Sequence, residues 1–398
     1  MSRIGAFELG LSGGTVPRMT GGVTTRRAFA AGVCALAALG SALPGPAAET
    51  VQERWEGLPL LDVVVRPGES RRATLAVSES FVGAVLDTPV LVVRGMHPGP
   101  TLCLTAGIHG DELNGVEIVR RTLQRLNAQE LRGTVIGVPI VNLHGFRRSS
   151  RYLPDRRDLN RYFPGRSRGS SASRIAYSFF ESVIRSCDNL VDLHTGSFHR
   201  TNLPHLRANL EIPETLELAR GFGSTIVVHS FGTQGTLRRA ATDAGIPAIT
   251  YEAGEPMRFV QSDVERGLEG IRDLMGAIGM LKPRRRAREP QVFNRSHWVR
   301  SDDGGILISQ VELGERVEIG ALLGTVTDPL SNEKSELRAP HLGTVIGMAL
   351  NQVVMPGFAA FHLGIRVGED PPLPQPDEDW AIEAVEDTAM ENDERPEE

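Results

Sequence analysis

Histidine and glutamate residues with the spacing of metal ligands stand near residue 110. Residues 101–114 read TLCLTAGIHGDELN: an apolar, strand-like run ends at Gly107, and His109 and Glu112 follow at once. Imidazole nitrogen and carboxylate oxygen are typical zinc ligands, and three of them plus a water make a catalytic rather than a structural site. A His-x-x-Glu pair is common by chance, so it predicts a metal site only if further ligands follow elsewhere.

Two later strand-like runs end on residues of the same chemical types. The run at residues 189–193 ends on His194, and the run at residues 247–251 ends on Glu252. The carboxyl ends of parallel strands share one rim of a sheet, which is where open α/β sheets place their chemistry. The sequence therefore predicts that these side chains converge with His109 and Glu112 on one site.

Other residues of the same types compete for these roles. The histidines that could replace His194 as third ligand are His144, His199, His205 and His229. His199 and His205 stand close together, but in a polar stretch that we interpret as a loop and not as a strand end. Glu255 is the alternative to Glu252, although it lies three residues beyond the strand end and next to Pro256.

Amphipathic helices alternate with the strand-like runs. Apolar residues at helical spacing predict helices at about residues 113–127, 172–186 and 262–281. Further strands are expected at residues 60–65, 72–77, 89–93 and 134–141. This alternation predicts an α/β domain, which we place at residues 50–285. The long polar segment 142–171 is expected to be either functional or mobile.

The pattern of predicted elements changes after a basic linker, KPRRRAR, at residues 282–288. Short strands bounded by glycines then predict a small β-barrel or sandwich domain at residues 290–368, like a barrel-sandwich hybrid of the lipoyl type. Its one lysine, Lys334, lies in NEKSE and lacks the usual attachment context, which argues against a lipoyl or biotin carrier. The tail at residues 369–398 is rich in Asp, Glu and Pro and is predicted to be disordered.

The N-terminus resembles a twin-arginine secretion signal. Arg26 and Arg27 in TTRRAF precede an Ala/Gly/Leu run and then the small residues PGPAA. We therefore predict a signal peptide at residues 1–48 and a periplasmic location. The apolar run is too short for a permanent bilayer-spanning helix, so no stable membrane span is expected in the mature chain. The alternative is a disordered N-terminal extension.

Length and composition describe an ordinary globular chain. The 398 residues suggest about two domains. A net charge of -6 and the lack of a broad basic face argue against nucleic acid as a partner. Beyond the predicted signal, Cys103 and Cys187 each stand beside an apolar run. We interpret them as small buried apolar residues, although an oxidising periplasm would permit a disulfide.

Four motifs occur in an order that resembles the succinylglutamate desuccinylase/aspartoacylase family. They are HGDE followed by Asn-Gly, then DLNR, DLHTG and YEAG, which begin at residues 109, 158, 192 and 251. The resemblance covers about residues 90–365. It implies the mixed α/β sheet of zinc carboxypeptidases, with helices on both faces, followed by a small barrel-sandwich-like β-domain.

The same resemblance implies a metal centre and a base. His109, Glu112 and His194 resemble the family's ligands for one zinc ion per chain, and Glu252 resembles its general base. Such a ligand set leaves zinc an open position, where a water approaches pKa ~7 and becomes a usable nucleophile. Glu252 would take the proton of that water and deliver it to the departing amine.

Polar residues of the segment 142–171 complete the implied site. Asn160 and Arg161 resemble the family's pair that binds a substrate carboxylate. Arg151 is the nearest match to the arginine that polarises the scissile carbonyl, and Arg157 competes because the segment before DLNR is longer here. Arg161 could instead form a structural ion pair with Asp158.

Two aspartates next to the implied ligands could have a supporting role. Asp111 or Asp192 could orient a ligating histidine, because metal-bound imidazoles usually donate their other ring N–H to a carboxylate. Both could equally be turn or capping residues.

The favoured function is hydrolysis of the amide bond in a small N-acyl amino acid or a related carboxylate-bearing substrate. The alternatives are an exported metallocarboxypeptidase acting on peptides or peptidoglycan stems and, from another class, a binding protein that kept the fold. A homo-oligomer is compatible with the sequence.

Overall fold

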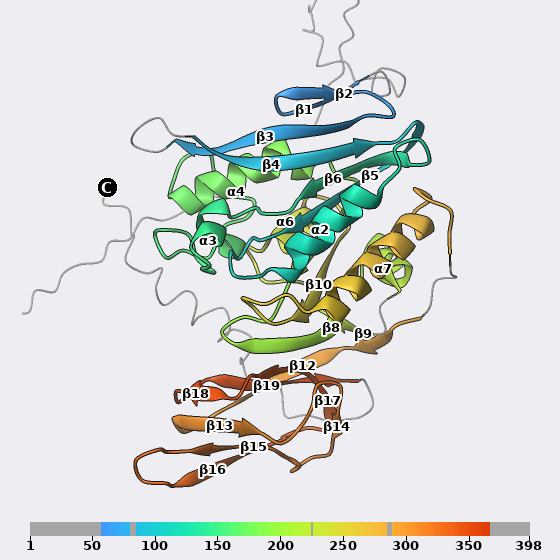
Figure 1. Ribbon diagram of the computed structural model, residues 1–398. Coiled ribbons are helices and arrows are strands. Elements are labelled where there is room, and N and C mark those ends of the chain that lie inside the picture. Colours follow the sequence, from blue (N-terminus) through green and yellow to red (C-terminus); the bar gives the residue numbers. More distant parts are fainter. Residues whose placement is uncertain (1–56, 80–84, 224–225, 285–288, 367–398) are drawn as a thin grey trace, which may run out of the picture. The chain divides into compact units, whose positions relative to one another are not determined.

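The computed structural model describes residues 57–79, 85–223, 226–284 and 289–366. The predicted signal peptide and acidic tail lie outside the described residues, as does most of the basic linker, so these three remain predictions. The described chain is a mixed α/β protein with one large mixed sheet, helices on both sides of it, and antiparallel strands at its C-terminal end (Figure 1). This confirms the predicted fold class.

Parallel strands form the centre of the large sheet. Its main path runs β12-β19-β17-β8-β10-β7-β5-β6-β4-β3. Strands β5, β7 and β10 are adjacent and parallel, so their carboxyl ends share one rim. The bounds of the strands up to β10 are β1 Leu58–Leu60, β2 Val63–Val65, β3 Ser70–Glu79, β4 Val85–Arg94, β5 His97–Ala106, β6 Arg132–Val138, β7 Asn189–His194, β8 Arg200–Ala208, β9 Ile226–His229 and β10 Ala248–Gly254.

Alternating residues of the central strands pack against two sets of helices. In β5, Leu102 and Leu104 belong to the core under α2 (Asn114–Arg125), α5 (Pro213–Phe222) and α7 (Gln261–Ala277). Cys103, which points to the opposite face, belongs to the core under α4 (Ser171–Ser182) and α6 (Leu237–Asp243). The period of two follows from the pleat of a strand, and it covers both faces of the sheet with apolar contacts. The remaining helices are α3 Leu143–Arg147, η1 Leu159–Arg161 and η2 Ile184–Ser186.

The predicted elements correspond to observed ones with small shifts at the ends. The three predicted helices are α2, α4 with η2, and α7. The predicted strand at residues 60–65 is instead a hairpin of β1 and β2. The interpretation of residues around 199–205 as a loop was wrong from Arg200 onward. These residues start β8, whose polar side chains are accommodated between β10 and the C-terminal strands.

The C-terminal strands extend the large sheet and add a second one. Strand β8 pairs with β17, and β9 pairs with β11, so the hydrogen bonding continues from the α/β region into the C-terminal strands. A separate antiparallel sheet has the order β16-β15-β13-β18. The bounds are β11 Gln291–Phe293, β12 Arg295–Arg300, β13 Gly305–Ser309, β14 Arg316–Val317, β15 Leu322–Thr327, β16 Lys334–Arg338, β17 Gly343–Ala349, β18 Gln352–Val354 and β19 Ala359–Ile365.

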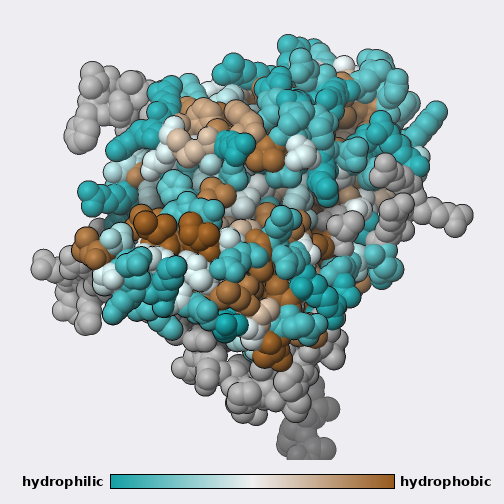
Figure 2. Space-filling model, turned by 60° about the horizontal axis from the view of Figure 1, so that its bottom comes forward, coloured by the Kyte–Doolittle hydropathy of each residue, from teal (hydrophilic) through white to brown (hydrophobic). Residues whose placement is uncertain are grey.

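The second sheet exposes apolar side chains on one surface. Ile306 and Val353 are register partners on β13 and β18, and both are exposed, as are Ile308 and Met355. Figure 2 shows apolar side chains gathered among hydrophilic ones on the face where the C-terminal strands come forward. The oligomeric state of the protein stays a prediction. Among the described residues, no helix is long and apolar enough to cross a membrane.

Cys103 and Cys187 form a disulfide, so their interpretation as unbonded apolar residues was wrong. Cys187 ends η2 just before β7, and β7 pairs with β5 from Leu102 and Asn189 onward. This register brings the two Cα atoms to 5.7 Å across 84 residues of sequence. The pairing depends on strand neighbourhood, which cysteine spacing alone does not reveal.

The disulfide makes a prediction about stability. Changing both cysteines to alanine should lower the free energy of unfolding by about 2–4 kcal/mol, because the bond restricts a long loop in the unfolded chain. Denaturant unfolding with and without a reductant measures this difference. Reductant should destabilise the wild type and leave the double variant unchanged; equal behaviour of both proteins would contradict the bond.

Candidate active site

Three buried side chains converge at the carboxyl ends of β5 and β7. His109 Nδ1 lies 2.7 Å from Glu112 Oε1, and His194 Nδ1 lies 2.9 Å from Glu112 Oε2. One ligand atom from each residue lies within 4.8 Å of the others. His109 and Glu112 come from the turn between β5 and α2, and His194 is the last residue of β7. The structure thus brings together the three residues predicted as metal ligands.

Two glycines shape the turn that carries His109 and Glu112. Gly107 has a φ of +60°, which L-residues with a side chain rarely adopt. At Gly110, a Cβ atom would lie only 2.0 Å from the backbone carbon of Gly145 in α3, so the two backbones touch directly. The sequence GIHG therefore folds as a tight turn locked against α3.

An aspartate carboxylate lies next to the Nε2 atom of each imidazole, on the side of the ring that faces away from Glu112. Asp158 Oδ1 lies 3.1 Å from His109 Nε2, and Asp192 Oδ2 lies 2.8 Å from His194 Nε2. The Thr105 hydroxyl in turn donates to Asp192 Oδ1 at 2.7 Å. With Nε2 held in this way, both Nδ1 atoms face the carboxylate of Glu112. This donor set fits a zinc ion, whose histidine ligands typically have such carboxylate partners.

Only one of the two aspartates considered as supports contacts an imidazole. Asp192 does so, whereas the backbone carbonyl of Asp111 accepts a hydrogen bond from the Met257 amide at 2.7 Å and ties the ligand turn to the loop after β10. Asp158 was missed as a partner of His109. Its one sequence signal is its place at the start of the DLNR motif.

The electrostatics of this cluster favour positive charge at its centre. Burial opposes ionisation of Glu112, but the two imidazoles outweigh it and hold the pKa of that carboxyl well below its usual range. Burial also opposes protonation of His194, but Asp192 and Glu112 raise the pKa of that imidazole well above its usual value. A divalent cation between the Nδ1 atoms would take the place of a proton there.

Arg151, and not Arg157, joins the cluster. Its guanidinium donates to Asp158 Oδ2 at 2.7 Å and to Ser197 Oγ at 2.6 Å, and it lies 3.4 Å from Glu112 Oε1. Arg157 pairs with Asp155 instead, at 2.9 Å near the surface. The geometry therefore places a fixed positive charge beside the ligand cluster and distinguishes the two arginines that the sequence left open.

Glu252 lies next to the cluster on the neighbouring strand. In the parallel pair β10–β7 it is the register partner of His194, so both side chains point to the same face. Its Oε2 accepts a hydrogen bond from Asn202 Nδ2 at 3.1 Å, and its Oε1 lies 3.4 Å from Arg207 Nε. The side chain stays 14% exposed, so it can meet a water or a substrate.

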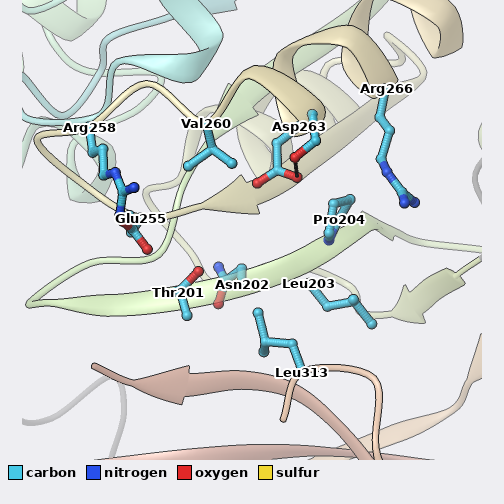
Figure 3. Close-up of a pocket in the computed structure, with 11 residues that line it drawn as sticks. Thr201, Asn202, Leu203, Pro204, Glu255, Arg258, Val260, Asp263, Arg266 and Leu313 are labelled. Atoms are coloured by element: carbon cyan, nitrogen blue, oxygen red, sulfur yellow. Dashed lines mark hydrogen bonds and ion pairs between the residues drawn. The ribbon is translucent and has the colours of Figure 1, made fainter. Parts of the chain in front are cut away.

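The competing Glu255 pairs with Arg258 at 2.8 Å and lines a cavity of about 360 Å³. The lining of this cavity includes Asn202 but neither Glu252 nor any of the three predicted ligands. In Figure 3, Asp263 and Arg266 extend from α7 on one side of this cavity, and β8 forms the other side. Glu255 therefore belongs to this cavity, and Glu252 is the glutamate beside the predicted metal ligands.

Asn160 and Arg161 form the short helix η1 that follows Asp158. Asn160 Oδ1 accepts a hydrogen bond from the Leu237 amide at the start of α6, at 2.8 Å, and Arg161 donates to the Asn160 carbonyl at 3.1 Å. The Asn160 amide N–H donates to Asp158 Oδ1 at 2.9 Å. Asn160 is thus hydrogen-bonded to the aspartate that supports His109, and the Arg161 guanidinium is hydrogen-bonded to Asn160.

The competing histidines have other partners. His205 is fully buried on β8 with Nδ1 2.7 Å from the Leu203 carbonyl, and His229 Nδ1 accepts from the Leu210 amide at 3.2 Å. His199 and His144 lie in a turn before β8 and in α3. The one cluster of potential metal ligands in the described part of the chain includes none of the four.

Nothing in the sequence indicated that Arg238 would be buried near the site. This arginine lies on α6 and is 5% exposed, and it donates to the Ser230 carbonyl at 2.8 Å. Burial and the nearby Arg207 lower the pKa of Arg238 to about 10, against the opposing influence of Asp192 and Glu252. Arg238 is thus a buried cation that interacts electrostatically with Asp192 and Glu252.

Comparisons with known proteins agree with this geometry. Residues 98–278 match the model of the succinylglutamate desuccinylase/aspartoacylase catalytic domain. The chain is 29% identical over 263 residues to the N-alpha-acetyl-L-2,4-diaminobutyric acid deacetylase of Halomonas elongata, covering 63% of this chain and 76% of that protein.

Solved structures share the fold over most of the chain. The product-bound ectoine utilization protein EutE (DoeB) of Ruegeria pomeroyi matches with a TM-score of 0.70 and 25% identity, over 78% of this chain and 98% of that one. A succinylglutamate desuccinylase of Silicibacter matches with a TM-score of 0.69 and 23% identity, over 78% of this chain and 97% of that one. Residues 98–278 thus match the catalytic domain of the succinylglutamate desuccinylase/aspartoacylase family, in agreement with the four sequence motifs.

Proposed function

We propose that the protein is a zinc-dependent hydrolase that cleaves the amide bond of a small N-acyl amino acid or a related carboxylate-bearing substrate. The observation that carries this proposal is the convergence of His109, Glu112 and His194 beside Glu252, with a carboxylate behind each imidazole. Relatives that are named as a deacetylase and a desuccinylase support the class of reaction.

Each side chain has a chemical task in this proposal. A zinc ion held by the three ligands would supply Lewis acidity and lower the pKa of a water. Glu252 would accept a proton from the attacking water and pass it to the departing amine, a role that requires a carboxylate within hydrogen-bond reach. Arg151 offers N–H donors where negative charge grows on the scissile carbonyl oxygen. Asn160 and Arg161 are the proposed partners of the substrate carboxylate.

A substrate panel tests this function. Release of free amine is measured from acetyl-, succinyl- and longer acyl-amino acids and, in parallel, from C-terminal dipeptides. The proposal expects the acyl amino acids to be cleaved with the higher kcat/KM. Faster cleavage of the peptides would favour the alternative, an exported metallocarboxypeptidase. Ligand binding without turnover of any compound would favour a binding protein.

We also propose that the protein is exported to the periplasm through its twin-arginine sequence. The disulfide between Cys103 and Cys187 supports this, since such bonds persist mainly in oxidising compartments. Fractionation of cells that produce the full chain, with Arg26 and Arg27 changed to lysine as the control, tests the location.

The aspartate behind His194 makes a prediction about metal affinity. Changing Asp192 to alanine should weaken zinc binding about 10- to 100-fold, because the imidazole loses the partner that orients it. Competition with a chromophoric chelator measures the affinity. Asp155→Ala, in a surface ion pair, is the control and should bind zinc as the wild type does. Equal affinities of the two variants would contradict the role of Asp192.

A further inference from the structure

A row of residues on one face of the sheet connects the region of Glu252 with the C-terminal strands. Asn202 on β8 is the register partner of Gly254 on β10 and of Gly347 on β17. Gly347 is in turn the partner of His362 on β19. Asn202 and Gly347 lie directly opposite each other and so share a face, and the hydrogen bond from Asn202 Nδ2 to Glu252 Oε2 shows that the Asn202 side chain reaches Glu252.

Asn202 holds one oxygen of the Glu252 carboxylate. Its Nδ2 donates to Oε2 at 3.1 Å, and Arg207 lies 3.4 Å from the other oxygen. Asn202 is only 6% exposed, so water competes little for this bond. The carboxylate is therefore held at both oxygens, with an amide N–H on one side and a guanidinium on the other.

Gly347 provides the space that the Asn202 side chain occupies. A Cβ atom at Gly347 would lie 2.8 Å from Asn202 Oδ1 and 3.3 Å from His362 Cβ. His362 cannot easily give way, because it is 1% exposed and its ring stacks on Trp298 at 4.2 Å between centroids. Any side chain at Gly347 would therefore push the Asn202 amide away from its present position.

His205, the register partner of Glu252, does not compete for its carboxylate. Its Nδ1 lies 2.7 Å from the carbonyl oxygen of Leu203, so that ring nitrogen is directed to the backbone of its own strand. Burial and Arg207 lower the pKa of His205 to about 3, which keeps the imidazole uncharged. Asn202 and Arg207 are thus the side chains that hydrogen-bond or ion-pair with Glu252 in the described structure.

We infer that Asn202 is a positioning residue for Glu252 and that the C-terminal strands hold Asn202 in place through Gly347. The inference rests on the proposed role of Glu252 as general base. A base must lie within hydrogen-bond reach of the proton that it removes, and small misplacements of a catalytic group are costly. The C-terminal β-region would therefore contribute to catalysis although it supplies none of the proposed ligands.

Substitutions of Asn202 test the first part of this inference. Asn202→Ala should lower kcat about 10- to 100-fold, the range expected for the loss of a hydrogen bond to a charged group, with KM changed less than about threefold. Asn202→Asp keeps the size of the side chain but removes the N–H donor, so it should lose at least as much. Thr201→Ala, at the preceding position of the same strand, is the control and should keep kcat within about twofold.

Gly347→Ala tests the connection to the C-terminal strands. It should reproduce the loss of kcat with Asn202 intact, because the new methyl group displaces the Asn202 amide. In an Asn202→Ala background the same change should have almost no further effect, since the amide oxygen that it would meet is gone. Zinc content and thermal midpoint of each variant report whether the fold and the metal ligands are retained.

The outcomes separate this inference from the proposed function. If the wild type hydrolyses an N-acyl amino acid and Glu252→Gln does not, but Asn202→Ala and Asn202→Asp keep the wild-type kcat, the inference is wrong and the proposed function stands. Independent, multiplying losses from Asn202→Ala and Gly347→Ala would overturn the connection through Gly347. A wild type that hydrolyses no member of the panel would overturn both the function and the inference.

Discussion

Replacing His194 by alanine is expected to remove bound zinc and to lower kcat/KM for an N-acyl amino acid by about 1,000-fold or more. His194 supplies one of the two imidazoles whose Nδ1 atoms face Glu112. Without it, two ligands remain, and the carboxylate of Asp192 is left buried without its imidazole partner. Metal content by mass spectrometry and initial rates of amine release measure the two effects together.

His229→Ala is the matched control for this substitution. His229 also ends a strand, β9, but its ring accepts a backbone hydrogen bond from Leu210 and contributes nothing to the ligand cluster. This variant should bind one zinc per chain and keep its activity. If the His194 variant retained metal and activity while the His229 variant lost them, the assignment of the third ligand would be wrong.

Replacing Glu252 by glutamine is expected to lower kcat about 100- to 10,000-fold while zinc binding is retained. Glutamine has the same length and can still accept the hydrogen bond from Asn202, but its amide cannot take a proton from water. Because Glu252 is not among the three ligands, the metal site should remain intact. Steady-state kinetics, together with metal content, separate this loss of proton transfer from a loss of metal.

Glu255→Gln provides the comparison, since Glu255 pairs with Arg258 and lines a cavity whose lining includes neither Glu252 nor the three predicted metal ligands. It should keep kcat close to that of the wild type. Were the two glutamine variants equally active, Glu252 would not be the base. The measurement also distinguishes an enzyme from a binding protein. In a binding protein, Glu252→Gln would leave ligand affinity unchanged, and neither the wild type nor the variant would turn over any substrate.

The positions of the principal site residues could be predicted because they follow directly from the strands. The apolar runs of β5, β7 and β10 are easily recognised in the sequence. Each run ends on, or is closely followed by, a histidine or glutamate that core packing does not require. Parallel neighbours share their carboxyl rim, so His109, His194 and Glu252 had to approach one another once these strands were adjacent.

Residues whose neighbours come from distant parts of the chain could not be predicted in the same way. Asp158 reaches His109 across 49 residues, and Cys103 reaches Cys187 across 84. Strand β8 was not predicted, because it contains the polar residues Asn202, His205 and Arg207, and polar segments of this kind are typical of loops. The partner of Asn202 and Arg207 is Glu252, which is distant in sequence.

The C-terminal region illustrates the same limit at the level of the fold. Its short, glycine-bounded strands could be recognised in the sequence as a β-rich region, and the structure has antiparallel strands there. What the sequence did not indicate is that β17 continues the large sheet next to β8. In the sequence, Gly347 looks like an ordinary strand glycine. Only the pairing of β17 with β8 shows that a side chain at this position would collide with Asn202.

The most direct test of a zinc-dependent deacylase is a titration of the metal-free protein with zinc. The protein is stripped with a chelator, and the rate of amine release from the best acyl amino acid of the panel is followed as zinc is added. A zinc-dependent enzyme should show no activity without metal and a rise in rate that saturates at one zinc per chain. Full activity in the stripped protein, or a protein that binds one zinc and hydrolyses nothing, would contradict it.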